Sequence, residues 1–178
     1  MVDAGTGDGR YPLHVARAQA DTLTIGLDAS SDALAYAARR TIRERLPNLL
    51  LLCEPVESLA LGSVADVVTL HFPWGSLLNG ALAEDERAFA AICRLPRPGG
   101  VLRVMLSVTA RDGRAPLDEG DVARLGRAYR SRDLVLADRR AVTRADVEAA
   151  CSTWGKRLDV GGTRPGLLLR FVRGSAPA

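Results

Sequence analysis

Short, nearly continuous apolar runs recur along this 178-residue chain, and they constrain its fold more than any other feature. The runs LLLLC at 49–53 and VADVVTLHF at 64–72 contain few polar residues, as strands covered on both faces do. Between such runs lie segments whose apolar residues recur at helical spacing. This alternation predicts an α/β fold with a mostly parallel, doubly wound sheet.

The expected elements follow one another with no internal repeat or linker, so we expect a single domain over residues 1–178. Strands are predicted at residues 1–4, 22–28, 49–53, 64–72, 101–108, 133–142 and 167–172, with a turn at 97–100. Helices are predicted at residues 10–19, 30–46, 77–95, 121–130 and 143–154. We expect the last two strands to pair antiparallel at one edge of a seven-stranded, Rossmann-like sheet.

Composition excludes several protein classes. No apolar stretch reaches the roughly 20 residues of a membrane span, and the N-terminus lacks the basic and apolar regions of a secretory signal. We therefore expect a cytoplasmic protein. Cys53, Cys93 and Cys151 lack metal-ligand spacing, so we expect small buried thiols and no metal site. The net charge of +3 permits a polyanionic partner without requiring one.

A glycine-rich turn follows the first predicted strand. Gly5, Gly7 and Gly9 fall at alternate positions, unlike the G-x-G-x-x-G of dinucleotide-binding enzymes. Glycines at such a turn allow the backbone to approach a ligand closely. The neighbouring carboxylates of Asp3 and Asp8 disfavour a phosphate and favour a cation, such as the sulfonium and ammonium of S-adenosylmethionine.

Two further acids follow the next two predicted strands. Asp28 ends the second strand, where a carboxylate can accept hydrogen bonds from both hydroxyls of a ribose. Glu57 comes soon after the third strand, where methyltransferases bind adenine. The expected antiparallel sheet edge is also typical of class I methyltransferases. Together these features favour S-adenosylmethionine as the cofactor.

The chain contains two tryptophans, Trp74 and Trp154. Trp74 lies in HFPWGSLL at 71–78, just beyond the fourth strand, where ligands bind in open α/β sheets. Amino-methyltransferases carry [DNS]-P-P-[YFW] there, but the amide or carboxylate of that motif is absent. A ring nitrogen such as N1 of adenine needs no such acceptor, because its lone pair is free at neutral pH. The two tryptophans would then stack on a flipped base, unless they merely fill the core or an edge.

The segments DAGTGDGRYPLHVAR, GLDAS, LPNLLLL, FPWGSLL and TWGKRL resemble the aminoglycoside-resistance 16S rRNA methyltransferases that modify N1 of adenine 1408. The similarity runs from residue 2 to about residue 172, and PWGSLL is its most specific part. It implies a monomeric class I enzyme that methylates this decoding-site adenine in the 30S subunit, using S-adenosylmethionine.

The resemblance also implies a role for particular residues. Trp74 and Trp154 would sandwich the flipped adenine, and Ser76 would help to position it. Cofactor contacts would come from Asp3, Gly5, Thr6, Gly7, Asp28, Ala29, Val56, Glu57, His71 and Trp74. Phosphates of the rRNA would be held by Lys156, Arg157 and Arg164.

Two departures from the family pattern concern rRNA binding. Family members have an N-terminal hairpin before the first strand, whereas this chain begins within that strand, so we expect the hairpin to be absent from residues 1–178. Three explanations stay open: a mis-assigned start, a truncated chain, or a homologue that lacks the hairpin. Gly162 stands where the family has an arginine. Two other hypotheses stay open: a class I methyltransferase acting on another nucleic acid or a small molecule, and a cofactor-binding protein without catalysis.

Overall fold

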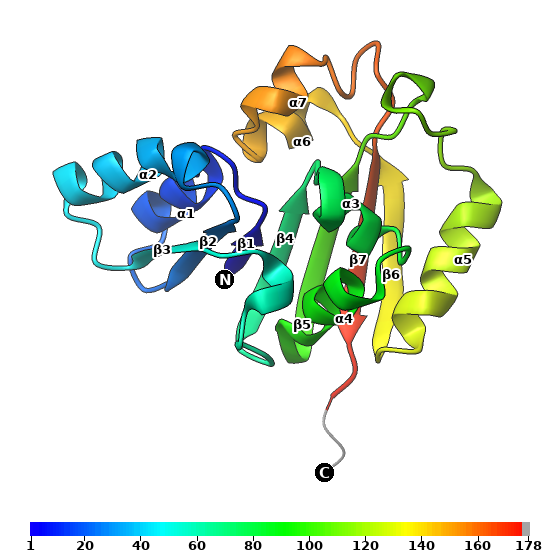
Figure 1. The fold of residues 1–178 in the computed structure, drawn as a ribbon, viewed down its shortest axis with the longest axis horizontal. Coiled ribbons are helices and arrows are strands. Elements are labelled where there is room, and N and C mark those ends of the chain that lie inside the picture. The colour runs from blue at the N-terminus through cyan, green and yellow to red at the C-terminus, as the bar shows by residue number, and fades with distance from the viewer. Residues whose placement is uncertain (176–178) are drawn as a thin grey trace.

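A seven-stranded sheet forms the centre of the computed structural model, which describes residues 1–175 (Figure 1). Its strands lie in the order β3-β2-β1-β4-β5-β7-β6. They are β1 (Val2–Ala4), β2 (Thr24–Asp28), β3 (Leu49–Cys53), β4 (Ala65–His71), β5 (Pro96–Leu106), β6 (Leu134–Ala141) and β7 (Leu167–Arg173). The pairs β5–β7 and β6–β7 are antiparallel and the other neighbours are parallel. The predicted fold class and antiparallel edge are therefore confirmed.

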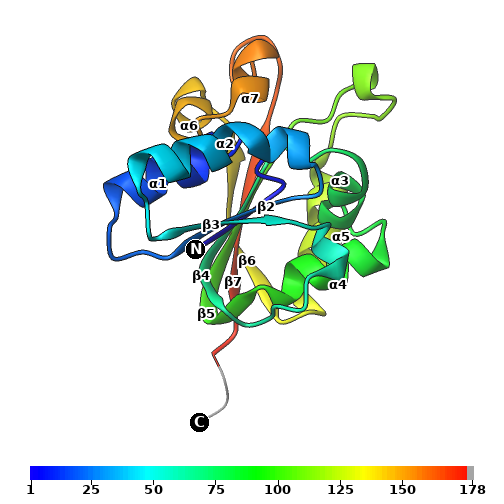
Figure 2. The same ribbon diagram turned by 60° about the vertical axis from the view of Figure 1, so that its left-hand side comes forward.

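Helices cover both faces of this sheet. They are α1 (Arg10–Ala18), α2 (Ser31–Glu44), α3 (Gly75–Ala81), α4 (Glu86–Arg94), α5 (Glu119–Arg130), α6 (Arg144–Ala149) and α7 (Thr153–Arg157), with 3-10 turns η1 (Val56–Ser58) and η2 (Ala110–Asp112). Figure 2 shows α1 and α2 on one side of the sheet and α3, α4 and α5 on the other. None of the helices that the structure describes is long and apolar enough to cross a membrane.

The apolar side chains divide into one large and two smaller clusters. The large cluster lies between the sheet and α3–α5, and includes the fully buried Ile92 and Phe171. A second cluster joins α1 and α2 to β3. The third lies beneath α6 and α7 and is formed by Phe72, Met105, Val142, Val147, Ala150, Val160 and Leu168, with Trp154 and Leu158 packed against it. This third cluster supports one of the two tryptophans.

Two of the predicted helices are each divided in the structure. The segment predicted as one helix at 77–95 is broken because Asp85 caps α4, accepting hydrogen bonds from the backbone of Arg87 and Ala88. The segment 143–154 is broken at Cys151, whose φ is 51°, and Ser152 caps α7. In both cases a side chain that bonds the backbone starts a new helix where periodicity alone continues the old one.

The predicted turn at 97–100 lies inside a strand instead. Ala65 pairs with Pro96 and Val67 pairs with Val101, so the register shifts between the two pairs. The intervening residues form a bulge within β5, since a bulge accommodates extra residues without ending a strand.

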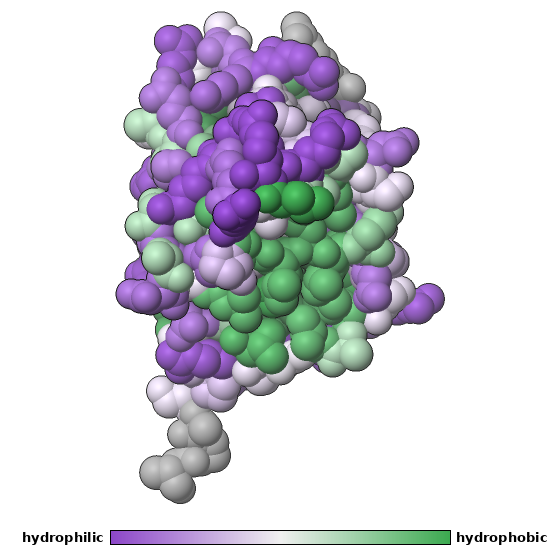
Figure 3. Space-filling view, turned by 90° about the vertical axis from the view of Figure 1, so that its left-hand side faces the viewer, coloured by the Kyte–Doolittle hydropathy of each residue, from purple (hydrophilic) through white to green (hydrophobic). Residues whose placement is uncertain are grey.

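The edge strand β3 is covered on one face and only partly covered on the other, where Leu52 packs against the large cluster. Leu49 and Leu51 pack in the cluster beneath α1 and α2. On the sheet edge that carries β2 and β3, Leu50 is 48% exposed and Leu23 is 52% exposed, and this side of the molecule shows an apolar area (Figure 3). The expectation that LLLLC forms a strand covered on both faces is therefore wrong.

Candidate functional site

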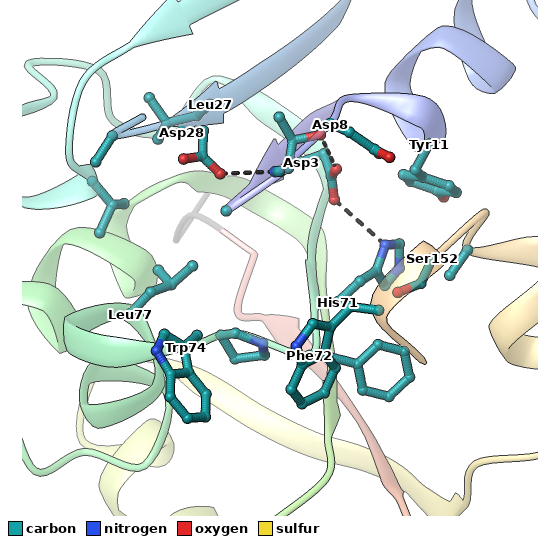
Figure 4. Close-up of a pocket in the computed structure, with 18 of the residues that line it drawn as sticks. Asp3, Asp8, Tyr11, Leu27, Asp28, His71, Phe72, Trp74, Leu77 and Ser152 are labelled. Carbon is teal, nitrogen blue, oxygen red and sulfur yellow. Dashed lines mark hydrogen bonds and ion pairs between the residues drawn. The ribbon is translucent and has the colours of Figure 1, made fainter. Parts of the chain in front are cut away.

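A cavity of about 370 Å³ lies at the carboxyl ends of the parallel strands (Figure 4). The cavity is lined by residues 3–8 except Ala4, Tyr11, residues 27–29, 54–57, 71–77 except Gly75, and 150–154. Every residue predicted to contact the cofactor lines this cavity, and so do Ser76 and both tryptophans. Carboxyl ends of parallel strands meet at one edge of a sheet, which is why segments far apart in sequence converge here.

The glycine turn is held tightly beneath the cavity. The backbone amides of Gly5 and Thr6 donate to the carbonyl of Leu27 at 2.8 and 2.9 Å. Gly5 has a φ of 72°, a conformation that favours glycine, and a Cβ there would lie 2.3 Å from Leu77 Cδ2, which would have to move. Gly7 has a φ of 57° and open space around its missing Cβ. The turn therefore presents bare backbone to the cavity.

Asp28 braces the same turn from the end of β2. Its Oδ2 accepts a hydrogen bond from the Gly7 amide at 2.7 Å, and its Oδ1 accepts one from the Ser30 amide at 2.9 Å. A carboxylate has about four acceptor positions. Asp28 can thus hold the turn and still accept hydrogen bonds from a ligand.

A buried Asp3–His71 pair forms the floor of the cavity. The hydroxyl of Thr6 donates to Asp3 Oδ2 and that of Thr69 donates to Asp3 Oδ1, both at 2.6 Å, and His71 Nδ1 lies 3.5 Å from Asp3 Oδ1. Burial raises the pKa of Asp3, opposed by the neighbouring His71. Burial also lowers the pKa of His71, opposed by the charge of Asp3. A cation placed against Asp3 would favour its charged form, so the floor of the cavity suits a cationic ligand.

The two tryptophans lie at the mouth of the cavity. Trp74 is 65% exposed, and its ring centroid is 6.3 Å from that of Trp154, with the planes tilted by 52°. Phe72 lies behind Trp154, also at 6.3 Å. Phe72 has a φ of 54°, a conformation that costs energy for a bulky residue and is often found at functional sites. Because the two indole planes are tilted, a flat base fits between them only after one ring turns.

Several lining residues were not predicted from the sequence. Tyr11 contacts His71 edge-on, with ring centroids 4.5 Å apart. The hydroxyl of Thr153 donates to Asp8 Oδ2 at 3.3 Å and so joins α7 to the glycine turn. Leu77 and Ser152 complete this part of the lining. The sequence signal for them is their place in the segments that resemble the family, DAGTGDGRYPLHVAR, FPWGSLL and TWGKRL, the last of which Ser152 directly precedes.

The three predicted phosphate ligands have different surroundings. Lys156 and Arg157 are exposed on α7, beside Trp154 and outside the cavity. The Arg164 guanidinium donates to Ser107 Oγ at 2.8 Å and to Asp112 Oδ2 at 2.5 Å. The side chain of Arg164 is 10% exposed. The guanidinium of Arg164 is thus paired and largely covered, unlike the side chains of Lys156 and Arg157, and its role as a phosphate ligand stays a prediction.

Gly162 lies in the loop before β7, where the side chain of Asp159 leaves no room for a larger residue. A Cβ on Gly162 would lie 2.4 Å from Asp159 Oδ1. That carboxylate accepts a hydrogen bond from the Thr163 amide at 2.8 Å and pairs with Arg144. An arginine at position 162 would displace it, so this loop is built around the small residue.

The similarity of this chain to known proteins includes all the residues that line the cavity. The model of a family described as NpmA, 16S rRNA (adenine(1408)-N(1))-methyltransferase, matches residues 1–172. A 16S rRNA (adenine(1408)-N(1))-methyltransferase of Streptoalloteichus hindustanus is 34% identical over 179 residues, covering 89% of this chain and 80% of the relative.

Solved structures show the same relationship. The crystal structure of a mutant 16S rRNA (adenine(1408)-N(1))-methyltransferase from Catenulisporales acidiphilia, with cosubstrate SAM, matches with a TM-score of 0.85 and 28% identity. The match covers 99% of this chain and 86% of the chain in that structure. The aminoglycoside resistance methyltransferase NpmB1 matches with a TM-score of 0.79 and 36% identity, covering 97% of this chain and 85% of that one. The similarity thus includes all the segments that line the cavity.

Proposed function

Because the chain belongs to the 16S rRNA (adenine(1408)-N(1))-methyltransferase family, we propose that it transfers a methyl group from S-adenosylmethionine to N1 of adenine 1408 in 16S rRNA. This is the aminoglycoside-resistance type of rRNA methylation. The observation that carries the proposal is the lining of the cavity, which has acidic side chains at its floor and two tryptophans at its mouth.

The residues at the cavity floor fit the cofactor. When bound, S-adenosylmethionine supplies a methyl group activated by a sulfonium. We assign the cofactor's ammonium to Asp3, because this buried carboxylate has hydroxyl partners and His71 beside it but no arginine or lysine ion pair among the described residues. Asp28 would accept the ribose hydroxyls, and Val56 and Glu57 would lie along the adenine. Gly7, with open space around it, allows the cofactor to approach the backbone.

The residues at the mouth would orient the target base. Trp74 and Trp154 would stack on the two faces of the flipped adenine, and each such stack contributes roughly 1–3 kcal/mol. Ser76, in the first turn of α3, would help to fix the base in the plane between them. The N1 lone pair attacks without losing a proton first, so the site needs orientation and exclusion of water rather than a general base.

We further propose that the substrate is the assembled 30S subunit, bound by a monomer in the cytoplasm. Lys156 and Arg157 lie exposed next to Trp154, where they can contact phosphates around the flipped base. Phosphate contacts of this kind fix the orientation of a protein on nucleic acid but do not select the sequence.

Methylation of isolated 30S subunits, mapped by primer extension, tests the proposal. We expect a stop at adenine 1408 that requires S-adenosylmethionine. Trp74→Ala and Trp154→Ala should nearly abolish the stop with little change in cofactor affinity, because stacking concerns only the flipped base. Trp→Phe at either position should keep part of the activity.

The alternatives predict different results. A methyltransferase with another target would bind the cofactor and leave adenine 1408 unmodified. A protein without catalysis would bind the cofactor and methylate neither rRNA nor small molecules. Near wild-type methylation by either alanine variant would show that this tryptophan only fills space.

A further inference from the structure

A buried arginine lies directly behind one wall of the base-binding mouth. The guanidinium carbon of Arg164 is 5.5 Å from the centroid of the Trp154 ring, within the range of a cation–π contact. Phe72 contacts the same indole. The Trp154 ring therefore has both this guanidinium and Phe72 as neighbours.

The guanidinium itself is fixed by a loop far away in sequence. It donates to Ser107 Oγ at 2.8 Å, to the Ser107 carbonyl at 3.0 Å and to Asp112 Oδ2 at 2.5 Å. Asp112 also accepts hydrogen bonds from the amide and the hydroxyl of Thr109, at 2.9 and 3.0 Å. Ser107 in turn donates to the carbonyl of Pro165. The segment after β5 and the loop before β7 are thereby joined behind Trp154.

The pair is covered as well as bonded, since the side chains of Arg164 and Asp112 are 10% and 11% exposed. A covered pair is a costly way to stabilise a fold, because desolvation offsets most of the Coulombic gain. The hydrogen bonds that the planar guanidinium donates to Ser107 and to Asp112 do, however, fix it in one orientation. Fixing an orientation is what a stacking surface requires.

We propose that Arg164, held by Asp112, is a positioning residue that sets the Trp154 ring for stacking on the target base. This inference rests on the proposed function, and it gives Arg164 a different role from that of a phosphate ligand. It also makes the segment 107–112 part of the base-recognition apparatus, although none of the side chains described in that segment lines the cavity.

Kinetics on 30S subunits separate the two roles of Arg164. The variants are Arg164→Gln, Asp112→Asn and their double mutant, which leaves no unpaired buried charge. If Arg164 positions Trp154, all three should lower kcat by between about tenfold and a hundredfold, the usual consequence of misplacing a reacting group. The KM for 30S subunits and its salt dependence should stay unchanged, and the double mutant should lose little more than either single one.

A phosphate ligand would behave in the opposite way. Arg164→Gln would then raise KM and flatten its salt dependence, while Asp112→Asn would free the guanidinium and leave kcat unchanged. Either result overturns the inference. The control is Arg97→Ala, which removes an exposed pair with Asp66 at the far end of the sheet and should change neither parameter.

Fluorescence provides a readout that does not need methylation. In a Trp74→Phe background, Trp154 is the one remaining tryptophan. Arg164→Gln and Asp112→Asn should each shift its emission and increase its quenching by acrylamide, with circular dichroism confirming that the protein stays folded. Unchanged emission in folded variants overturns the inference. If the wild type fails to methylate 30S subunits, the proposed function fails, and this fluorescence comparison still decides the role of Arg164.

Discussion

Asp3 and His71 illustrate how single residues set the properties of the cavity. Both side chains are buried, and burial moves the pKa of each toward the neutral form. The two hydroxyls that donate to Asp3 keep its carboxylate oriented. His71 lies between Asp3 and Tyr11, so it joins the cavity floor to α1.

The lowered pKa of His71 predicts how stability depends on pH. As pH falls through about 6.5, the ordinary value, the unfolded chain binds a proton at position 71 that the folded chain excludes. The unfolded state then binds more protons than the folded state, so the free energy of unfolding decreases as the pH decreases. Urea unfolding at pH 7 and at pH 5.5 measures this decrease in the free energy of unfolding. The decrease should be smaller for His71→Asn than for the wild type.

The matched control for this experiment is His14→Asn, at an exposed position of α1. Between pH 7 and pH 5.5 its free energy of unfolding should decrease as much as that of the wild type. Asp3 acts with the opposite sign, because its raised pKa adds stability as pH falls toward the ordinary value of 3.8. Equal losses in His71→Asn and the wild type would contradict the assignment of this pH dependence to His71.

Asp28 provides a second test at the residue scale. Asp28→Ala should weaken S-adenosylmethionine binding by about 1.5–3 kcal/mol, the range for hydrogen bonds to a charged acceptor, as measured by titration calorimetry. Asp32→Ala, at an exposed position in the first turn of α2, is the control and should bind normally. Measurable NADH binding without S-adenosylmethionine binding would refute the cofactor assignment.

The cofactor half of the site could be predicted from the sequence because strand ends converge in a parallel sheet. Asp3 lies within a recognisable strand, Asp28 ends the next one and Glu57 comes soon after the third, and all three residues line one cavity. The contacts of Arg164 could not be predicted in this way. Its ion pair with Asp112 joins residues 52 positions apart in two irregular loops, where no periodic pattern indicates a partner.

At the scale of elements, α7 is the most dependent on its surroundings. It has five residues, too few for a helix to be stable by itself in water. It is held by the Ser152 cap, by the Thr153–Asp8 hydrogen bond and by packing on Phe72. Periodicity predicted one helix over 143–154, and it failed because the capping bond of Ser152 competes with continuation of that helix.

Gly155 allows α7 to pack closely enough to place Trp154. A Cβ at this position would lie 2.8 Å from Phe72 Cε2 and 3.0 Å from Val147 Cγ1. Gly155→Ala should therefore destabilise the protein by about 1–3 kcal/mol, the cost of overpacking, and should lower methylation. Thermal unfolding and single-turnover methylation measure the two effects.

Gly126→Ala in α5 is the matched control, because a Cβ there meets only Leu136 Cδ2, at 3.8 Å. An alanine in a helix with room for it should stabilise the protein by up to about 1 kcal/mol. If Gly155→Ala behaved like Gly126→Ala, close packing of α7 on Phe72 would not be what positions Trp154.

At the scale of the whole molecule, charge is separated between the inside and the outside of the site. Carboxylates line the cavity floor, and Lys156 and Arg157 lie outside it on α7. A net charge of +3 is modest for a protein that binds rRNA. Binding should therefore depend on a few well-placed cations rather than on overall attraction.

Salt dependence tests this arrangement. Lys156→Ala and Arg157→Ala should each weaken binding to 30S subunits and flatten the plot of log K against log salt by about one phosphate contact. Cofactor affinity should not change. Arg130→Ala, in the last turn of α5, is the control and should retain the full slope, because α5 lies on a different side of the molecule from α7 (Figure 1). Unchanged slopes for both α7 variants would show that rRNA binds another face.

The continuity of the cavity, from Asp28 at one end to Trp74 at the other, has a pharmacological consequence. Compounds that imitate only the cofactor would meet a turn and carboxylates of a kind that many methyltransferases share, so they would inhibit those enzymes too. A compound that joins an adenosine-like group to a flat aromatic group reaching the two indoles would combine both halves of one cavity. The flat aromatic group at the tryptophans would then make the compound selective for the resistance methyltransferases over other methyltransferases. The adenosine-like group at the cofactor end would supply most of the affinity.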